Sequence, residues 1–222
     1  MIQINKIISI GGNCISFDFT KHLGVRECGP VDNFAEFNIW KSAALFSNEI
    51  KKNIFKEKYQ TRIATETEKK QFYFCSKVYT FEKGFRIVHN DFESKKFKSN
   101  LKKRIRNFHK YYKRSLKDDT LWYVYSLDYL DSELSENSLY RIKNELPKNV
   151  TSHLICLGIR AKNPLFQKYF NYYIELDSEG IYRWGDKSQG IEIANLLEQK
   201  YQIKINYEGE VSKKCNIFSS WT

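Results

Sequence analysis

Hydrophobic residues in this chain gather into short runs of two kinds. Runs of the first kind predict strands, and they are KIISIGG (6–12), TLWYVYSL (120–127), SHLICLGI (152–159), FNYYIEL (170–176) and IKINY (203–207). TLWYVYSL and SHLICLGI are continuously apolar, without the polar alternation of a strand that has one face in water, so they predict strands buried on both faces.

Between these runs, apolar residues recur every three or four positions, which is typical of helices packed on one face. The predicted helices are CISFDFTKHLG (14–24), residues 36–52, SENSLYRIKNEL (135–146) and IEIANLLEQKY (191–201). The longest pattern predicts a further helix over 97–116. Lysine and arginine fill most of its other positions, and its apolar stripe comprises Phe97, Leu101, Ile105, Phe108, Tyr112 and Leu116.

Strands that alternate with helices favour an α/β fold of three layers, with a mostly parallel sheet covered by helices on both faces, as in Rossmann-like or SGNH-like folds. QFYFCSKVYTF and GFRIVHNDF are β-prone runs on either side of a Glu82-Lys83-Gly84 turn, so they predict a β-hairpin. We expect one α/β domain over 1–222, with an insertion or hairpin at 53–84 and a C-terminal tail at 208–222.

The formal net charge of +11 suits a polyanionic partner, and the basic segment 95–117 is the natural contact surface. No apolar run is long enough to span a membrane, and MIQINKIISI is too short and too polar for a signal peptide. We therefore expect a cytoplasmic protein, with peripheral membrane contact left open. The five cysteines are scattered and lack metal-ligand spacing, so neither a disulfide framework nor a metal site is expected.

A thiol follows the first apolar run directly, because Gly11, Gly12 and Asn13 lead into Cys14. In open α/β sheets, ligands bind at the carboxyl ends of strands, where loops enter helices. A helix N-terminus lowers the pKa of a thiol there, and its N–H groups, with Asn13, can hold an oxyanion. A small buried cysteine after an ordinary turn fits the same spacing, and spacing alone leaves both interpretations open.

A nucleophilic thiol needs a base, and His89 is the best candidate. It ends an apolar β-run, with Asp91 two residues later to orient the imidazole, so the sequence predicts a triad of Cys14, His89 and Asp91. An ordinary surface turn of His, Asn and Asp is the alternative. Structural or solvated roles are expected for the other histidines, which are His22, His109 and His153.

Several segments, in order, resemble a bacterial domain family described as papain-like cysteine peptidases. SIGGNC, LGVR and GPVDNF resemble its S-L-G-x-x-C, L-G-L-R and P-F-D-W elements, and VHNDF resembles its H-D-F element. LKKRIRNFHKYY before LWYVYSL is similar to its R-R-I-x-R-F helix and following strand. The likeness covers residues 7 to 130.

The resemblance implies that Cys14 is the nucleophile and His89 its base, with Asp32 and Asp91 as acidic partners and Arg26 as a substrate-binding residue. The match is incomplete in its acidic element, because an asparagine separates His89 from Asp91. Either aspartate could therefore orient the imidazole.

Two further departures are Val31 and Asn33, which stand where that family has Phe and Trp. GGNC also resembles the Gly-Asn-Cys opening of a capsule-polysaccharide acetyltransferase family that uses coenzyme A. It occupies the position of the Gly-Asp-Ser nucleophile turn of SGNH-type esterases as well. The predicted α/β sheet fits these two families better than it fits papain, because papain packs its cysteine helix on an antiparallel barrel.

Two functions follow from these patterns. The first is a thiol-dependent acyl-transfer enzyme, a peptidase, hydrolase or acyltransferase, acting on a small molecule, a peptide or a glycan such as a surface polysaccharide or its precursor. It requires no cofactor, and a coenzyme A thioester would be the donor in the acyltransferase version. The second is a non-catalytic basic module that binds nucleic acid or another polyanion through the helix at 95–117.

Overall fold

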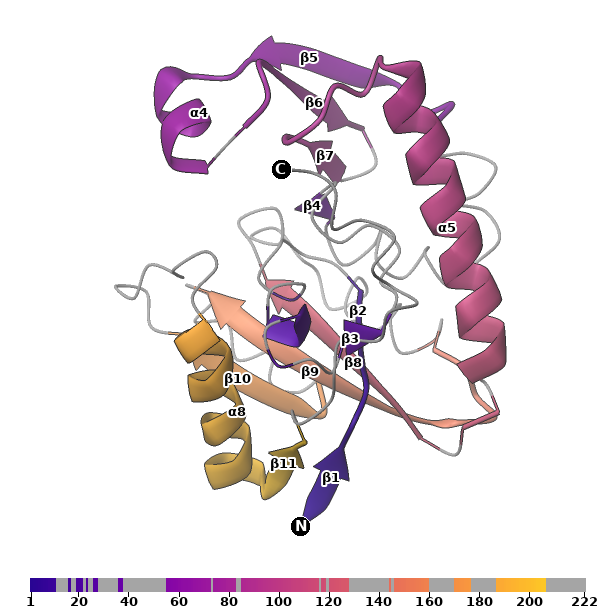
Figure 1. Ribbon diagram of the computed structural model, residues 1–222, viewed down its shortest axis with the longest axis vertical. Coiled ribbons are helices and arrows are strands. Elements are labelled where there is room, and N and C mark those ends of the chain that lie inside the picture. Colours follow the sequence, from indigo (N-terminus) through magenta and orange to yellow (C-terminus); the bar gives the residue numbers. More distant parts are fainter. Residues whose placement is uncertain are drawn as a thin grey trace.

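In the computed structural model of the chain, a parallel sheet and an antiparallel sheet lie near opposite ends of one long helix, α5 (Lys95–Ser115) (Figure 1). The residues that the structure describes are 1–10, 16, 19–21, 23, 26–27, 36–37, 55–72, 74–82, 85–115, 117–118, 120–127, 144, 146–159, 170–176 and 187–206. Every structural statement below concerns these residues.

The parallel sheet has five strands in the order β3-β2-β8-β9-β10. Numbered along the chain within this sheet, that order is 2-1-3-4-5, so the direction of strand addition reverses between β2 and β8. Such a reversal is the topological switch point of a doubly wound sheet. The strands are β2 (Ile7–Ser9), β3 (Arg26–Glu27), β8 (Thr120–Leu127), β9 (Thr151–Ile159) and β10 (Tyr172–Leu176).

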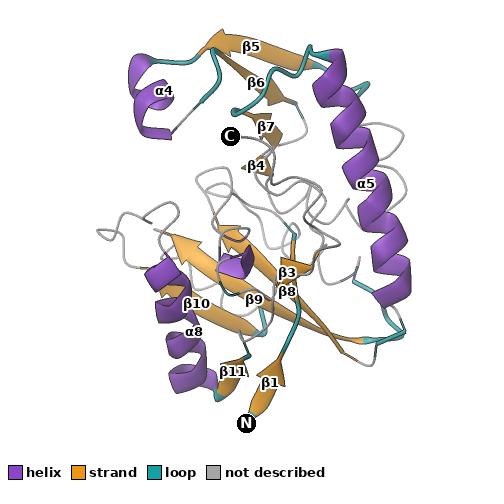
Figure 2. Cartoon of the chain, in the orientation of Figure 1, coloured by secondary structure: helices purple, strands orange, loops and turns teal. Residues whose placement is uncertain are grey.

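Both faces of the parallel sheet are buried, as the continuous apolar runs predict. In β8, Tyr123 and Tyr125 pack in the cluster that contains the stripe of α5, whereas Trp122 and Val124 pack with α8 (Lys187–Tyr201). Alternate residues of β9 divide in the same way. The α/β class, with a parallel sheet between helices, is therefore confirmed (Figure 2).

The second sheet is antiparallel, in the order β4-β7-β6-β5. Its strands are β4 (Glu36–Phe37), β5 (Tyr59–Ile63), β6 (Lys77–Phe81) and β7 (Phe85–Ile87), with α4 (Glu66–Phe72) between β5 and β6. The pairing of β6 with β7 confirms the predicted hairpin. The helix predicted from residue 36 is wrong at its start, because residues 36–37 pair with β7; residues 38–52 lie outside the described part.

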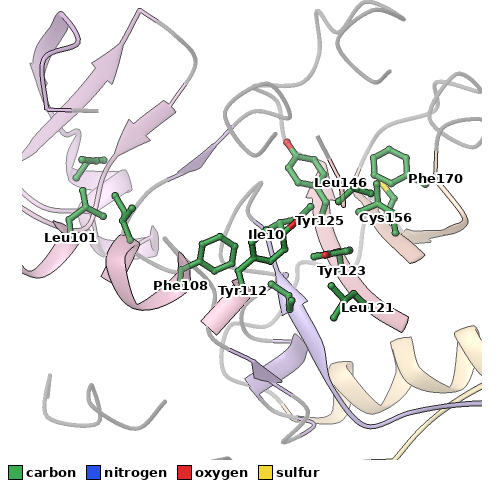
Figure 3. Close-up of a cluster of buried hydrophobic side chains, with 14 of the residues drawn as sticks. Ile10, Leu101, Phe108, Tyr112, Leu121, Tyr123, Tyr125, Leu146, Cys156 and Phe170 are labelled. Atoms are coloured by element: carbon green, nitrogen blue, oxygen red, sulfur yellow. The ribbon is translucent and has the colours of Figure 1, made fainter. Parts of the chain in front are cut away.

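Helix α5 confirms the long amphipathic pattern and connects the two sheets through one hydrophobic cluster. Phe97 near its start belongs to this cluster together with Phe92 and Phe81 of the antiparallel part. Phe108 and Tyr112 near its end lie beside residues of the parallel sheet (Figure 3). The buried stripe thus fixes the helix against both sheets.

The first predicted strand, KIISIGG (6–12), contains β2, and a strand that was not predicted precedes it. β1 (Ile2–Ile4) pairs in parallel with β11 (Ile203–Ile205), while β2 enters the main sheet. α8 ends at Tyr201, and the next residue, Gln202, has a φ of 57° that turns the chain directly into β11. The tail expected at 208–222 and most of the helix expected at 135–146 lie outside the described residues.

Candidate functional site

The carboxyl end of β2 lies at the switch point of the parallel sheet. Ser9 is paired with Val124 of β8, and the N–H of Ile10 donates to the carbonyl of Val124 at 3.0 Å. β8 continues beyond this level through Tyr125 and Ser126, both buried. Ligand sites of doubly wound sheets lie at such an edge.

Buried hydroxyl groups join the end of β2 to the helical residues that follow. The Oγ atoms of Ser9 and Ser16 are 3.0 Å apart, and the Thr20 hydroxyl donates to the Ser16 carbonyl at 3.2 Å. All three residues are fully buried, where an unmade hydrogen bond would be costly. The chain therefore leaves β2 after Ser9 and returns to contact it at Ser16, which is consistent with the predicted strand, turn and helix.

The intervening segment carries most of the predicted site. Gly11, Gly12, Asn13 and Cys14 lie outside the described residues, and so does Asp32. Their predicted roles stay predictions.

Arg26, the predicted substrate-binding residue, lies in β3, beside β2. Its backbone is in register with Ile7, two residues before the end of β2. Arg26 therefore lies on the strand next to β2, and β2 is the strand that precedes Cys14 in the sequence.

His89 follows β7 and precedes α5, on the antiparallel part of the fold. Its half-buried ring meets the ring of Phe74 edge-on, with centroids 5.6 Å apart. The adjacent backbone is held by the N–H of Cys75, which donates to the carbonyl of Val88 at 2.6 Å. The imidazole thus projects from a supported position at the end of a strand.

Asp91 helps to build the turn between His89 and α5. Its Oδ1 accepts hydrogen bonds from the hydroxyl of Tyr79 and from the N–H of Glu93, the latter at 3.0 Å. The bond from Tyr79 is the main reason why the pKa of Asp91 lies below its ordinary value. Burial, followed by this carboxylate, raises the pKa of Tyr79. Asp91 therefore has a structural partner in Tyr79, and its pairing with His89 stays a prediction.

His153 belongs to an aromatic stack in the part of the sheet where β8, β9 and β10 begin. Its ring lies 4.2 Å from that of Trp122, nearly parallel to it, and its Nδ1 is 3.4 Å from the hydroxyl of Tyr172. Burial lowers the pKa of His153, so the neutral imidazole is favoured. His109 is buried on α5, and His22 lies outside the described residues.

Sequence reasoning missed Ser9, Ser16 and Tyr79 as supports of the site. Serines near a Gly-Gly turn give no signal of their own, because their contact depends on how the helix packs against β2. For Tyr79, a weak signal existed: it sits at a buried position of a β-prone run, where a hydroxyl needs a partner.

Comparisons with protein-family models, curated proteins and solved structures gave no match to this chain. Within the described ranges, His, Cys, Asp and Glu do not gather in the groups of three or more that a metal ion requires. No helix in the described part of the chain is both long and apolar enough to cross a membrane.

Proposed function

We propose that the chain is a thiol-dependent acyl-transfer enzyme with Cys14 as its nucleophile. The observation that carries this proposal is the joined end of β2, where Ser9 contacts Ser16 beside β8 at the switch point. Cys14 precedes Ser16 by two residues, and consecutive Cα atoms are about 3.8 Å apart, so chain connectivity limits the separation of their Cα atoms to about 7.6 Å.

The reaction would proceed through a thioester. The thiolate of Cys14 attacks a carbonyl carbon, and the N–H groups of the turn and the side chain of Asn13 stabilise the oxyanion. The His89 imidazole takes the thiol proton and returns it to the leaving group when the carbonyl re-forms. Water or a substrate hydroxyl then attacks the thioester and gives its proton to His89; the C–S bond breaks, and the Cys14 sulfur recovers that proton from His89 as the product leaves.

Two acidic residues compete for the role of orienting His89. Asp91 is close to His89 in sequence, but it already accepts a hydrogen bond from the hydroxyl of Tyr79. This bond favours a structural role for Asp91 in the turn between His89 and α5. Asp32 is the other candidate named by the resemblance, and Arg26 on β3 would bind an anionic part of the substrate. This assignment predicts that Asp32→Asn slows acylation more than Asp91→Asn.

The doubly wound strand order supports an SGNH-like or Rossmann-like arrangement better than papain's helix on an antiparallel barrel. In such a sheet, ligands bind in the crevice at the carboxyl ends of the strands. Because GGNC resembles the opening of a capsule-polysaccharide acetyltransferase family, we favour a glycan hydroxyl, as in a surface polysaccharide or its precursor, over a peptide. A coenzyme A thioester would then be the acyl donor.

The test is capture of the acyl-enzyme. The protein is mixed with p-nitrophenyl acetate or acetyl coenzyme A, quenched in acid and analysed by intact and peptide mass spectrometry. We expect one acetyl group on Cys14, its loss in Cys14→Ser, slow formation in His89→Ala and normal formation in Cys75→Ser. Equal acetylation of Cys14→Ser and the unmodified sequence would refute the proposal.

A further inference from the structure

The exposed face of α5 carries charge of one sign. Residues 95–115 contain ten lysines and arginines and no acidic residue. The exposed members whose side chains are described are Lys95, Lys96, Lys102, Lys103, Arg106, Lys110 and Lys113.

These cations follow the helix from end to end. Lys102, Arg106 and Lys110 are four residues apart, so they lie on successive turns, about 6 Å apart along the axis. The 21 residues of α5 extend about 31 Å at 1.5 Å per residue. The result is a straight cationic strip.

The charge pattern works against the helix that carries it. Lys95 and Lys96 stand in the first turn, where the helix dipole favours acidic residues and none is present. Lys102 and Arg106 are like charges at i,i+4 spacing, which is also unfavourable. Proteins keep residues that destabilise a helix mainly where those residues serve a function, so this charge pattern indicates that the exposed face of α5 has a function.

The other described helices are ordinary by comparison. In α4, Lys69 forms an ion pair with Glu66 at 2.8 Å. The exposed positions of α8 include both Glu192 and Lys200. Solvent exposure by itself therefore does not explain the single sign of α5.

The opposite side of α5 is sealed in the core, because Leu101, Ile105 and Phe108 are fully buried. No apolar side chain of the described stripe is left to insert into a partner.

Two lysine side chains of α5 are held in place by aromatic rings. The Nζ of Lys98 lies 4.8 Å from the centre of the Phe92 ring, and the Nζ of Lys102 lies 5.0 Å from the centre of the Phe55 ring. Contact through this face would be electrostatic and rigid.

We propose that the exposed face of α5 docks the protein on an anionic phospholipid bilayer. A planar surface meets a straight helix along its whole length, and each basic residue near an anionic leaflet adds to the attraction. Nucleic acid fits less well, because the described aromatic rings of α5 (Phe97, Phe108 and Tyr112) are buried and cannot stack on bases. This proposal does not depend on the function of Cys14.

The test is sedimentation with vesicles of equal parts phosphatidylserine and phosphatidylcholine, and with vesicles of phosphatidylcholine alone. We expect binding to the anionic vesicles at low salt, loss of binding as salt rises, and none to phosphatidylcholine. Because each basic residue contributes a factor of roughly five, the variant Lys102→Gln, Arg106→Gln, Lys110→Gln should bind on the order of a hundredfold more weakly.

A matched control removes the same net charge from exposed lysines outside α5, through Gln substitutions at Lys58, Lys70 and Lys204. Circular dichroism verifies that both variants are folded. The proposal predicts that the control binds within about twofold of the original, since its changes lie off the strip. Equal loss in both variants, or no binding to anionic vesicles at low salt, would overturn it. Tighter binding to DNA than to vesicles would overturn it in favour of nucleic acid.

Discussion

Gly158 of β9 lies directly under the buried ring of Tyr173 on β10, and an added methyl group has no room there. A Cβ at residue 158 would lie 2.2 Å from Oη, 2.6 Å from Cζ and 2.9 Å from Cε2 of Tyr173. The ring is only 3% exposed and belongs to the cluster shared with α5, so it cannot swing into solvent. Gly158→Ala must therefore displace the ring or the strands.

The cost follows from overpacking in a closed core, which is typically 1–3 kcal/mol, or about 2 kcal/mol here. Alanine is intrinsically better than glycine within a strand by roughly 0.5 kcal/mol, which offsets a small part. For a chain of this size, each kcal/mol shifts the melting temperature by roughly 2–4 °C. The net cost is about 1.5 kcal/mol, so we expect Gly158→Ala to melt roughly 3–6 °C lower.

The assay is urea unfolding of a double-mutant cycle with Tyr173→Leu, which removes all three contacting atoms. Tyr173→Leu alone is destabilising because it leaves a cavity. In that background, Gly158→Ala should cost less than about 0.5 kcal/mol, giving a coupling energy above about 1 kcal/mol. An equal cost of Gly158→Ala in both backgrounds would show that the Tyr173 ring is not the obstacle.

Three further predictions concern the helix ends. The carboxylate of Glu68 accepts hydrogen bonds from the Arg62 side chain and from the N–H of Thr65, the latter at 2.8 Å, and Thr65 and Glu68 form a capping box at the start of α4. The hydrogen bond from Arg62 is the main reason why the pKa of Glu68 falls from 4.5 to about 2. Glu68→Gln should cost about 1 kcal/mol in urea unfolding at pH 7, a discounted figure for an exposed pair. Because the folded pKa is lowered, this stabilisation is present above pH 4.5 and lost as the pH falls towards 2; a cost unchanged at pH 2 would contradict it. Gln202→Gly should raise stability by about 1 kcal/mol, since glycine takes positive φ without penalty, and a lower urea midpoint would refute this. Lys95→Glu should raise it by about 0.5 kcal/mol at low salt and less at high salt, whereas a salt-independent change would point to another cause.

Some elements could be predicted because the pattern of apolar residues in the sequence matches the pattern of burial in the folded protein. The run TLWYVYSL coincides with β8 (Thr120–Leu127), since a strand covered on both faces needs apolar residues at nearly every position. The stripe of α5 was equally clear, because one helix face stays buried over its whole length.

Other parts escaped sequence reasoning for physical reasons. β5 (Tyr59–Ile63) is largely exposed, so no hydrophobic pattern marks it, and its pairing with β6 is a tertiary outcome. β1 is only three residues long and has polar neighbours, so no apolar run marks it, and its partner β11 lies about 200 residues away in sequence. α4 was also not predicted, although Thr65 and Glu68 have the capping-box spacing that marks its start.

The candidate site shows the same division. The strand and the helical residues around the cysteine turn follow from local pattern, and the contact of Ser9 with Ser16 supports them. The relation of Cys14 to His89 is not local, because the two follow strands of different sheets. Sequence spacing cannot fix such a distance, so a chemical measurement must decide.

The most direct test is the pH dependence of alkylation at Cys14. Iodoacetamide is added over a range of pH, and peptide mass spectrometry follows each cysteine, with Cys75 as the control of intermediate exposure. An activated thiol should react first among the five, with a midpoint at least one unit below the value of about 8.5 for a free cysteine. His89→Ala should shift that midpoint upward. Labelling of Cys14 no faster in the folded protein than in urea, with an ordinary midpoint, would contradict the assignment of Cys14 as the nucleophile.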